Sequence, residues 1–266
     1  MSFTEHNVNG VIFDTAGTLS VGGVRHAFTT RHGGVSPAPF DSLNLASNRG
    51  DREENILENY RRLGAAVGFD ASRAVGCRQI HSDLVRVARE EDAGKIRWDE
   101  RPYDADALIT NVPNLPLFAY GTDCCMITVY DPTSRSIAAI HAGWRGTASG
   151  IVLKALVTMM SLYGADPYTM RAAIGPAIGK CCLRPTVTWR MPSMSSWTPP
   201  WTSASSAAAT STTSTSNPST VCGCCAADWT PRASTYTPTA PNAAPIATGR
   251  TAAWAASAAA WRRSSS

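Results

Sequence analysis

Residues 107–147 read ALITNVPNLPLFAYGTDCCMITVYDPTSRSIAAIHAGWRGT. Short apolar runs rich in β-branched and aromatic residues follow one another here, separated by Pro, Asn, Gly and Asp, and this pattern predicts successive strands. A regular alternation of strands and helices would indicate a doubly wound parallel sheet, and it is not seen. The stretch therefore predicts an α+β domain with a mixed β-sheet and flanking helices.

Helices and further strands are expected around this stretch. Apolar side chains recur every three or four residues in 52–68 and in 147–163, which predicts two amphipathic helices. Residues 74–80, 84–88 and 172–174 have the composition of short strands. Together these segments supply the helices that would cover the sheet.

Composition narrows the class of protein. The 266 residues are long enough for a substantial core, and the net charge is +4. Lys and Arg nearly balance Asp and Glu up to residue 183, so no basic surface for binding nucleic acid is expected. Met1 is followed by polar residues, and no apolar run has the length of a membrane span. We therefore expect no membrane association. The cysteines lie mostly in adjacent pairs, which rarely bridge each other, so we expect a cytoplasmic location.

The chain changes character near residue 183. Residues 1–183 have the patterns of a folded catalytic domain, whereas residues 184–266 are a low-complexity segment of Ser, Thr, Ala, Pro and Trp. This composition predicts an irregular or disordered tail, but six of the eight tryptophans lie in it, which is unusual for a disordered segment. We hypothesise that it is an out-of-frame reading. Its three cysteines, Cys222, Cys224 and Cys225, match no compact zinc pattern.

The run VIFDTAGTL at 11–19 is similar to the first motif of haloacid-dehalogenase-like phosphotransferases, in which the Asp is the nucleophile. In that family a second acid follows two residues later, where this chain has Ala16. We therefore interpret the run as a strand followed by a glycine turn.

Three potential metal ligands each lie at the end of an expected strand. His141 directly follows 136–140, Cys124 comes shortly after 117–120, and His81 directly follows 74–80. Two imidazoles and one thiolate suit Zn²⁺, with a fourth position open to water or substrate. Histidine and cysteine also bind Cu²⁺. Alternatively, Cys124 is a nucleophile activated by a histidine that Asp123 or another acid orients.

Two glycine turns have the features of anion sites. Arg145 lies in the turn 143–147, directly before the expected helix, where unpaired N–H groups and the helix dipole favour an anion. An Arg side chain there can bind phosphate oxygens bidentately. Arg31 with Gly33 and Gly34 is a second candidate.

These segments in combination closely resemble the YfiH/YlmD family. The members of this family were long labelled multicopper polyphenol oxidases (laccases) and are now described as purine nucleoside phosphorylases. The resemblance extends from about residue 26 to 182 and is carried by TTRHGGVS (29–36), PFDSLNL (39–45), GD (50–51), ENYR (58–61), QIHS (79–82), DADA (104–107), DC (123–124), HAGWRGT (141–147) and GPAIGKCC (175–182).

The resemblance implies a fold, a metal and a reaction. The fold is the YfiH/CNF1-like mixed sheet, and the metal is zinc held by His81, Cys124 and His141, which are then also the catalytic residues. The reaction is phosphorolysis of purine nucleosides (adenosine, inosine, guanosine and methylthioadenosine), with adenosine deamination as a second activity. The partners are then a purine nucleoside and phosphate, with Arg145 and Arg31 as phosphate ligands and Asn44 as a hydrogen-bond partner of the ribose or base.

Two departures from the family pattern leave alternatives open. Cys125 and Met126 follow Cys124 where the family usually has an aliphatic residue and a proline. Beyond residue 182 the family continues with a further strand, a helix and a segment rich in Cys and Arg, and none of these is recognisable. An inactive truncated remnant therefore remains an alternative, and the older family label keeps a copper-dependent polyphenol oxidoreductase as another.

Overall fold

The computed structural model describes residues 3–178 and 255–261. Within these residues the α-helices are α1 (Glu53–Val67), α2 (Trp144–Ala148) and α3 (Ile151–Tyr163). The strands are β1 (Phe3–Val8), β2 (Val11–Ala16), β3 (Val24–Thr29), β4 (Val85–Val87), β5 (Ala107–Thr110), β6 (Leu117–Gly121), β7 (Cys125–Asp131), β8 (Ser136–Ala142), β9 (Arg171–Ile174) and β10 (Ala255–Trp261).

The strands of the described residues form two five-stranded sheets rather than one. The first has the order β1-β2-β3-β10-β6 and is antiparallel throughout, and the second has the order β4-β5-β8-β7-β9. Only the β4–β5 pair of the second sheet is parallel, which makes that sheet mixed. The α+β class expected from the sequence is confirmed.

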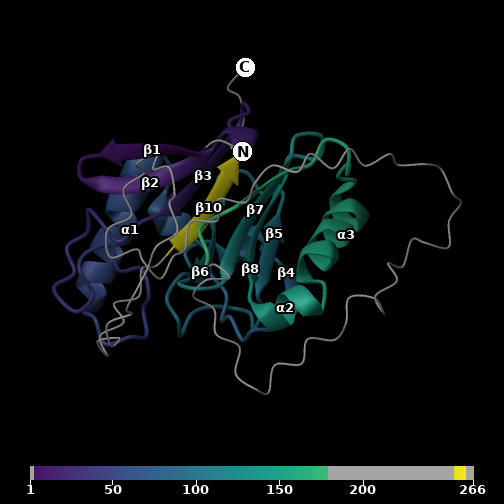
Figure 1. Cartoon of the computed structure of the whole chain (residues 1–266). Coiled ribbons are helices and arrows are strands. Elements are labelled where there is room, and N and C mark those ends of the chain that lie inside the picture. Colours follow the sequence, from purple (N-terminus) through teal and green to yellow (C-terminus); the bar gives the residue numbers. More distant parts are fainter. Residues whose placement is uncertain (1–2, 179–254, 262–266) are drawn as a thin grey trace, which may run out of the picture.

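The two sheets pack against each other, with α1 on the outer side of the first and α3 on the outer side of the second (Figure 1). One apolar cluster joins α1 to the first sheet, with Phe13, Tyr60 and Phe118 among its members. A second joins α3 to the second sheet and includes Ile140 and Met159. The described part of the chain is therefore layered as helix, sheet, sheet and helix, and β1 is a largely exposed edge strand of the first sheet.

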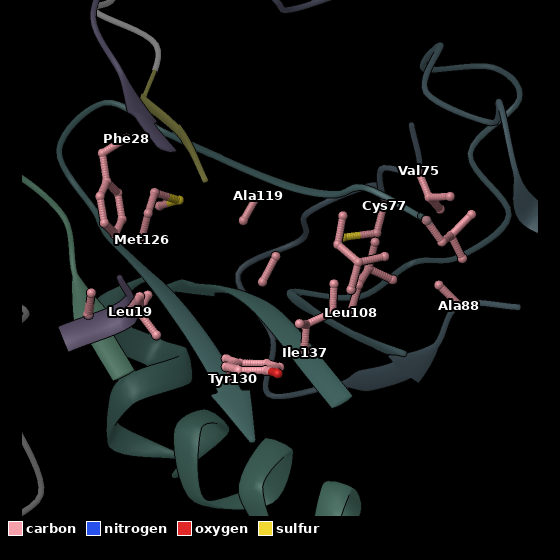
Figure 2. Close-up of a cluster of buried hydrophobic side chains, with 14 of the residues drawn as sticks. Leu19, Phe28, Val75, Cys77, Ala88, Leu108, Ala119, Met126, Tyr130 and Ile137 are labelled. Carbon is pink, nitrogen blue, oxygen red and sulfur yellow. The ribbon is translucent and has the colours of Figure 1, made fainter. Parts of the chain in front are cut away.

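A third apolar cluster fills the space between the sheets (Figure 2). It combines Phe28 and Ala119 of the first sheet with Met126, Tyr130 and Ile137 of the second. Burial of apolar surface contributes roughly 25 cal/mol per Å². This cluster supports the strand ends that carry the candidate site.

Two sequence expectations differ from the structure. Residues 74–80 form no regular strand; instead Val75 and Arg78 make single parallel bridges to Leu117 and Asp104. The helix expected over 147–163 is divided into α2 and α3, because Gly150 has a φ of +79° and interrupts the helical path. The helix expected over 52–68 is confirmed as α1, which ends at Gly68 in the left-handed conformation.

Strand β10 comes from the low-complexity segment of the sequence. Its backbone pairs antiparallel with β3 and with β6, so it lies between them (Figure 1). These seven residues form a strand where composition predicts irregular structure. The boundary expected at 183, the remainder of the tail and its three cysteines lie outside the described residues, so the proposed division of the chain stays a prediction.

The run at 11–19 is a strand followed by a short 3-10 turn, β2 and Gly17–Leu19, as interpreted from the sequence. Asp14 lies within the strand and is 3% exposed, and burial and Glu5 raise its pKa to about 6. On the adjacent β3, the ring Nε2 of His26 accepts a hydrogen bond from the Ala16 backbone N–H at 2.8 Å. Burial lowers the pKa of His26 to about 4.

His26 predicts a loss of stability in mild acid. Its pKa lies below the unfolded value of 6.5, so the unfolded chain binds more protons between pH 6.5 and about 4. Full stability is therefore present above pH 6.5, and up to roughly 3 kcal/mol is lost as the pH falls to about 4. Asp14 has the opposite sign, because its raised pKa favours folding as the pH falls below about 6.

The difference between wild type and His26→Gln isolates the histidine. Urea unfolding between pH 7 and pH 4.5 is expected to show a steeper loss of stability in the wild type than in the variant. Parallel pH profiles for the two proteins would contradict the prediction.

In the part of the chain described here, none of the helices combines the length and the apolar character needed to cross a bilayer.

Candidate metal and anion site

The topology of the second sheet brings distant parts of the chain together at one end of it. Strands β7 and β8 are antiparallel with Cys125 opposite Ala142, so Cys124 at the start of β7 lies beside the end of β8, where His141 is found. On the other side of β8, Ala107 pairs with Ile140, which places Asp106 next to His141. Strand β4 runs parallel to β5, and the loop before β4 carries His81.

His81, Cys124 and His141 form a compact group. Their ligand atoms all lie within 4.8 Å of one another, and the two imidazole rings are 4.9 Å apart at 88°. His141 is 3% exposed, Cys124 is half-buried, and His81 is on the surface. In a tetrahedral zinc site with these ligands, neighbouring donor atoms are about 3.3–3.6 Å apart. Small side-chain rotations would close the remaining gap, so the donor set fits a divalent metal ion.

Glycine is needed where the turn after β8 passes the group. A Cβ atom added at Gly143 would lie 3.2–3.4 Å from His81, Cys124 and His141 at once. A Cβ at Gly146 would lie 2.6 Å from the backbone oxygen of Ser82. Gly143 thus lets the turn pass close to the three candidate ligands, and Gly146 lets α2 pack against the loop that carries His81.

Asp106 is the acid that orients His141. Its Oδ1 is 2.7 Å from Nδ1 of His141, and both side chains are buried. Burial raises the pKa of Asp106, but the hydrogen bonds from His141 and Ser82 together outweigh burial and hold that pKa below its usual value. The carboxylate is therefore ionised, and with Nδ1–H donated to it, Nε2 of His141 is the ring nitrogen available to a metal ion.

The two histidines have opposite electrostatic environments. Burial opposes protonation of His141, but hydrogen bonds to Asp106 and Cys124 outweigh it and raise the pKa of His141 to about 9. Burial, His141 and the positive charge of Arg145 lower the pKa of His81, with Asp106 acting in the opposite sense. A metal ion would displace the proton from His141, as metal binding to histidine does in general.

Among the expected phosphate ligands, Arg145 lies nearest to this group. Its guanidinium is close enough to His81 to lower the pKa of that residue. The side chain is exposed and stacks on the Trp144 ring at 4.6 Å from the ring centroid. Arg145 therefore presents a positive charge at the solvent side of the site.

Arg31 and Asn44 are engaged elsewhere. The Arg31 guanidinium donates to the carboxylate and to the backbone carbonyl of Asp41, at 2.6 and 2.7 Å. Asn44 is 0% exposed, and its amide donates to Asp51 while its carbonyl oxygen accepts from Ala46. These contacts make both residues part of the loop between β3 and α1.

Asp106 is a functional candidate that reasoning from the sequence missed. The alternative with Cys124 as nucleophile required an orienting acid and named Asp123, whose side chain is exposed. The signal was present, because Asp106 lies in the DADA segment directly before the buried run 107–110. An acid at the start of a buried strand has to find donors, and here it finds His141.

The sequence of the chain matches one protein-family model and resembles several curated proteins. Residues 25–195 match the family model "Multi-copper polyphenol oxidoreductase laccase". A purine nucleoside phosphorylase of Mycobacterium bovis is 36% identical over 178 residues, which are 67% of this chain and 66% of that protein. One of Deinococcus radiodurans is 40% identical over 156 residues, 58% of this chain and 57% of that protein. The chain thus spans two-thirds or less of these curated relatives.

Solved structures agree with this similarity. The hypothetical protein YfiH of Bacillus licheniformis superposes with a TM-score of 0.61 at 32% identity, covering 68% of this chain and 67% of that one. YlmD of Geobacillus stearothermophilus gives a TM-score of 0.60 at 31% identity with the same coverage.

Proposed function

The chain belongs to the multi-copper polyphenol oxidoreductase laccase family that includes YfiH and YlmD, and on this premise we propose that it is a metal-dependent purine nucleoside phosphorylase. The observation that carries the proposal is the convergence of His81, Cys124 and His141 beside the exposed Arg145. The relatives that bear the name purine nucleoside phosphorylase support the reaction. Two imidazoles and one thiolate suit zinc, which we propose as the metal.

The proposed reaction exchanges a base for phosphate. An oxygen of inorganic phosphate forms a bond to C1′ of the ribose, the bond between C1′ and the purine nitrogen breaks, and the base leaves with a proton. The products are the free base and ribose 1-phosphate. Adenosine and inosine are the proposed substrates, and deamination of adenosine is the proposed second activity.

Each residue has a distinct part in this scheme. Arg145 binds the phosphate through charge-assisted hydrogen bonds, and its stacking on Trp144 limits the orientations of the guanidinium. His81, Cys124 and His141 would hold the metal, which supplies Lewis acidity and lowers the pKa of water at the site. Burial of His141 and its bond to Asp106 keep the ligand in one orientation.

The cysteines Cys77, Cys124 and Cys125 form no disulfide, which fits the proposed cytoplasmic location.

Incubation of the purified, zinc-loaded chain with adenosine and phosphate tests the function. We expect inosine from deamination of adenosine, hypoxanthine from phosphorolysis of that inosine, and ribose 1-phosphate in an amount equal to adenine plus hypoxanthine. Base release that does not depend on phosphate, or no release at all, would refute phosphorolysis.

Arg145→Gln is expected to weaken phosphate use selectively. A hydrogen bond to a charged group contributes about 1.5–3 kcal/mol, so the KM for phosphate is expected to rise roughly 10- to 100-fold, with a smaller change in the KM for the nucleoside. The matched control is Arg86→Gln, because Arg86 is an exposed arginine on β4. Equal kinetics for Arg145→Gln and the wild type would exclude Arg145 as the phosphate ligand.

The older family label suggests copper chemistry on phenols. In residues 3–178, a single group of three His, Cys, Asp or Glu side chains has metal-binding geometry. This group can hold one ion, whereas a multicopper site needs ligands for several. Metal analysis of protein purified without added copper discriminates between the two activities.

A further inference from the structure

The carboxylate of Asp106 lies between the two segments that carry the histidines of the site. Its own backbone is fixed on both sides, because its N–H donates to the Leu84 carbonyl and its carbonyl accepts from the His141 N–H at 2.7 Å. The residue is 1% exposed. Asp106 is therefore a rigid point between the loop before β4 and the end of β8.

Five donors converge on this one carboxylate. Oδ1 accepts from Nδ1 of His141 at 2.7 Å and from the His81 backbone N–H at 3.1 Å. Oδ2 accepts from the backbone N–H and the hydroxyl of Ser82 at 2.6 and 2.7 Å, and from the Ile80 N–H at 3.3 Å. A carboxylate is suited to this position because both of its oxygens only accept.

The loop at 80–82 needs such an anchor. His81 has a φ of +59°, in the left-handed region that residues other than glycine rarely adopt. Three consecutive backbone N–H groups point at Asp106, and this arrangement holds His81 in that conformation. A second contact holds Gln79, the residue before this loop. Its side-chain amide donates to the Tyr120 carbonyl on β6 and accepts from the Tyr120 N–H.

We propose that Asp106 is a positioning residue for the two histidine ligands of the metal. Asp106 fixes His141 through its ring and His81 through the backbone of the loop. One carboxylate thereby sets the separation of the two imidazoles before any metal arrives. The inference rests on the metal-dependent function proposed above. It assigns Asp106 no contact with substrate or metal.

Asp106→Asn tests this role with zinc affinity as the readout. Asparagine keeps the shape but turns one acceptor into an N–H₂ donor that faces other donors. Loss of a residue that orients a metal ligand costs about 10- to 100-fold in metal affinity, and we expect this loss in competition titrations with a chelator. Asp104→Asn is the matched control, because Asp104 is two residues away and forms an exposed ion pair with Arg78. The control is expected to bind zinc like the wild type.

A second measurement covers the case in which Asp106→Asn does not fold. In the zinc-loaded wild type with ¹⁵N-labelled histidine, NMR is expected to show His141 protonated at Nδ1 and bound to zinc through Nε2. Equal zinc affinity of wild type and Asp106→Asn, absence of zinc binding by the wild type, or ligation through Nδ1 would each overturn the proposal. Zinc affinity is measured without substrate, so its outcome is distinguishable from failure of phosphorolysis.

Discussion

Replacement of His141 by alanine is expected to eliminate metal binding and phosphorolysis together. His141 is buried, it lies between Asp106 and Cys124, and its Nε2 is the proposed donor. Without it, only His81 on an exposed loop and the half-buried thiol of Cys124 remain. Two protein ligands are too few for a stable zinc site. We expect less than a tenth of an equivalent of zinc to remain after dialysis, and activity at background.

The control for this variant is His6→Ala. His6 lies on β1, bonds the Thr15 hydroxyl at 2.8 Å and stacks on Phe13, so its loss leaves the site intact. Circular dichroism establishes that His141→Ala is folded. A folded His141→Ala protein that retains zinc and turnover would rule out the site described here.

Gly34→Ala is expected to destabilise the fold by about 3 kcal/mol, at the upper end of the cost of overpacking. An added Cβ would lie 2.0 Å from the backbone oxygen of Ser42 and 2.5 Å from the Cα of Leu43. That backbone cannot withdraw easily, because the Ser42 and Leu43 N–H groups both donate to the Arg31 carbonyl and the Ser42 carbonyl accepts from Ser36. The loss is a large part of a typical margin of about 5–15 kcal/mol.

Urea unfolding measures this effect as a shift in the midpoint at constant slope. Gly22→Ala is the matched control, because a Cβ at Gly22 meets no atom within 4 Å. Gly34→Ala with the stability of Gly22→Ala would contradict the close approach of the two loop segments.

Local pattern was sufficient for most elements of the fold. The apolar period of residues 52–68 identified α1, and the alternating runs from 107 to 140 identified β5 to β8. The division into two sheets was not predictable, because strand pairing such as Cys125 opposite Ala142 depends on contacts far apart in the sequence. The break at Gly150 was missed because glycine within an apolar helical period is usually tolerated.

The clustering of the three candidate ligands was predictable, and their surroundings were less so. His81, Cys124 and His141 were identified from their positions at strand ends and from the family resemblance, and the structure places them together. Arg31 and Asn44 are polar residues of a conspicuous motif, but their partners are Asp41 and Asp51 within the loop itself. Sequence alone does not reveal which polar groups are already paired. The position of Asp106 directly before a buried run indicated that it needs donors, but its pairing with His141 depends on the register of β5 and β8.

X-ray absorption spectroscopy at the zinc edge gives the sharpest test of the proposed metal centre. If His81, Cys124 and His141 bind one ion, the spectrum contains one sulfur at about 2.3 Å and light-atom scatterers at about 2.0–2.1 Å, two of them from imidazole. The sulfur contribution is expected to disappear in Cys124→Ser. A zinc-loaded wild-type protein without sulfur in the first shell, or with more than one sulfur, would contradict a site made of these three side chains.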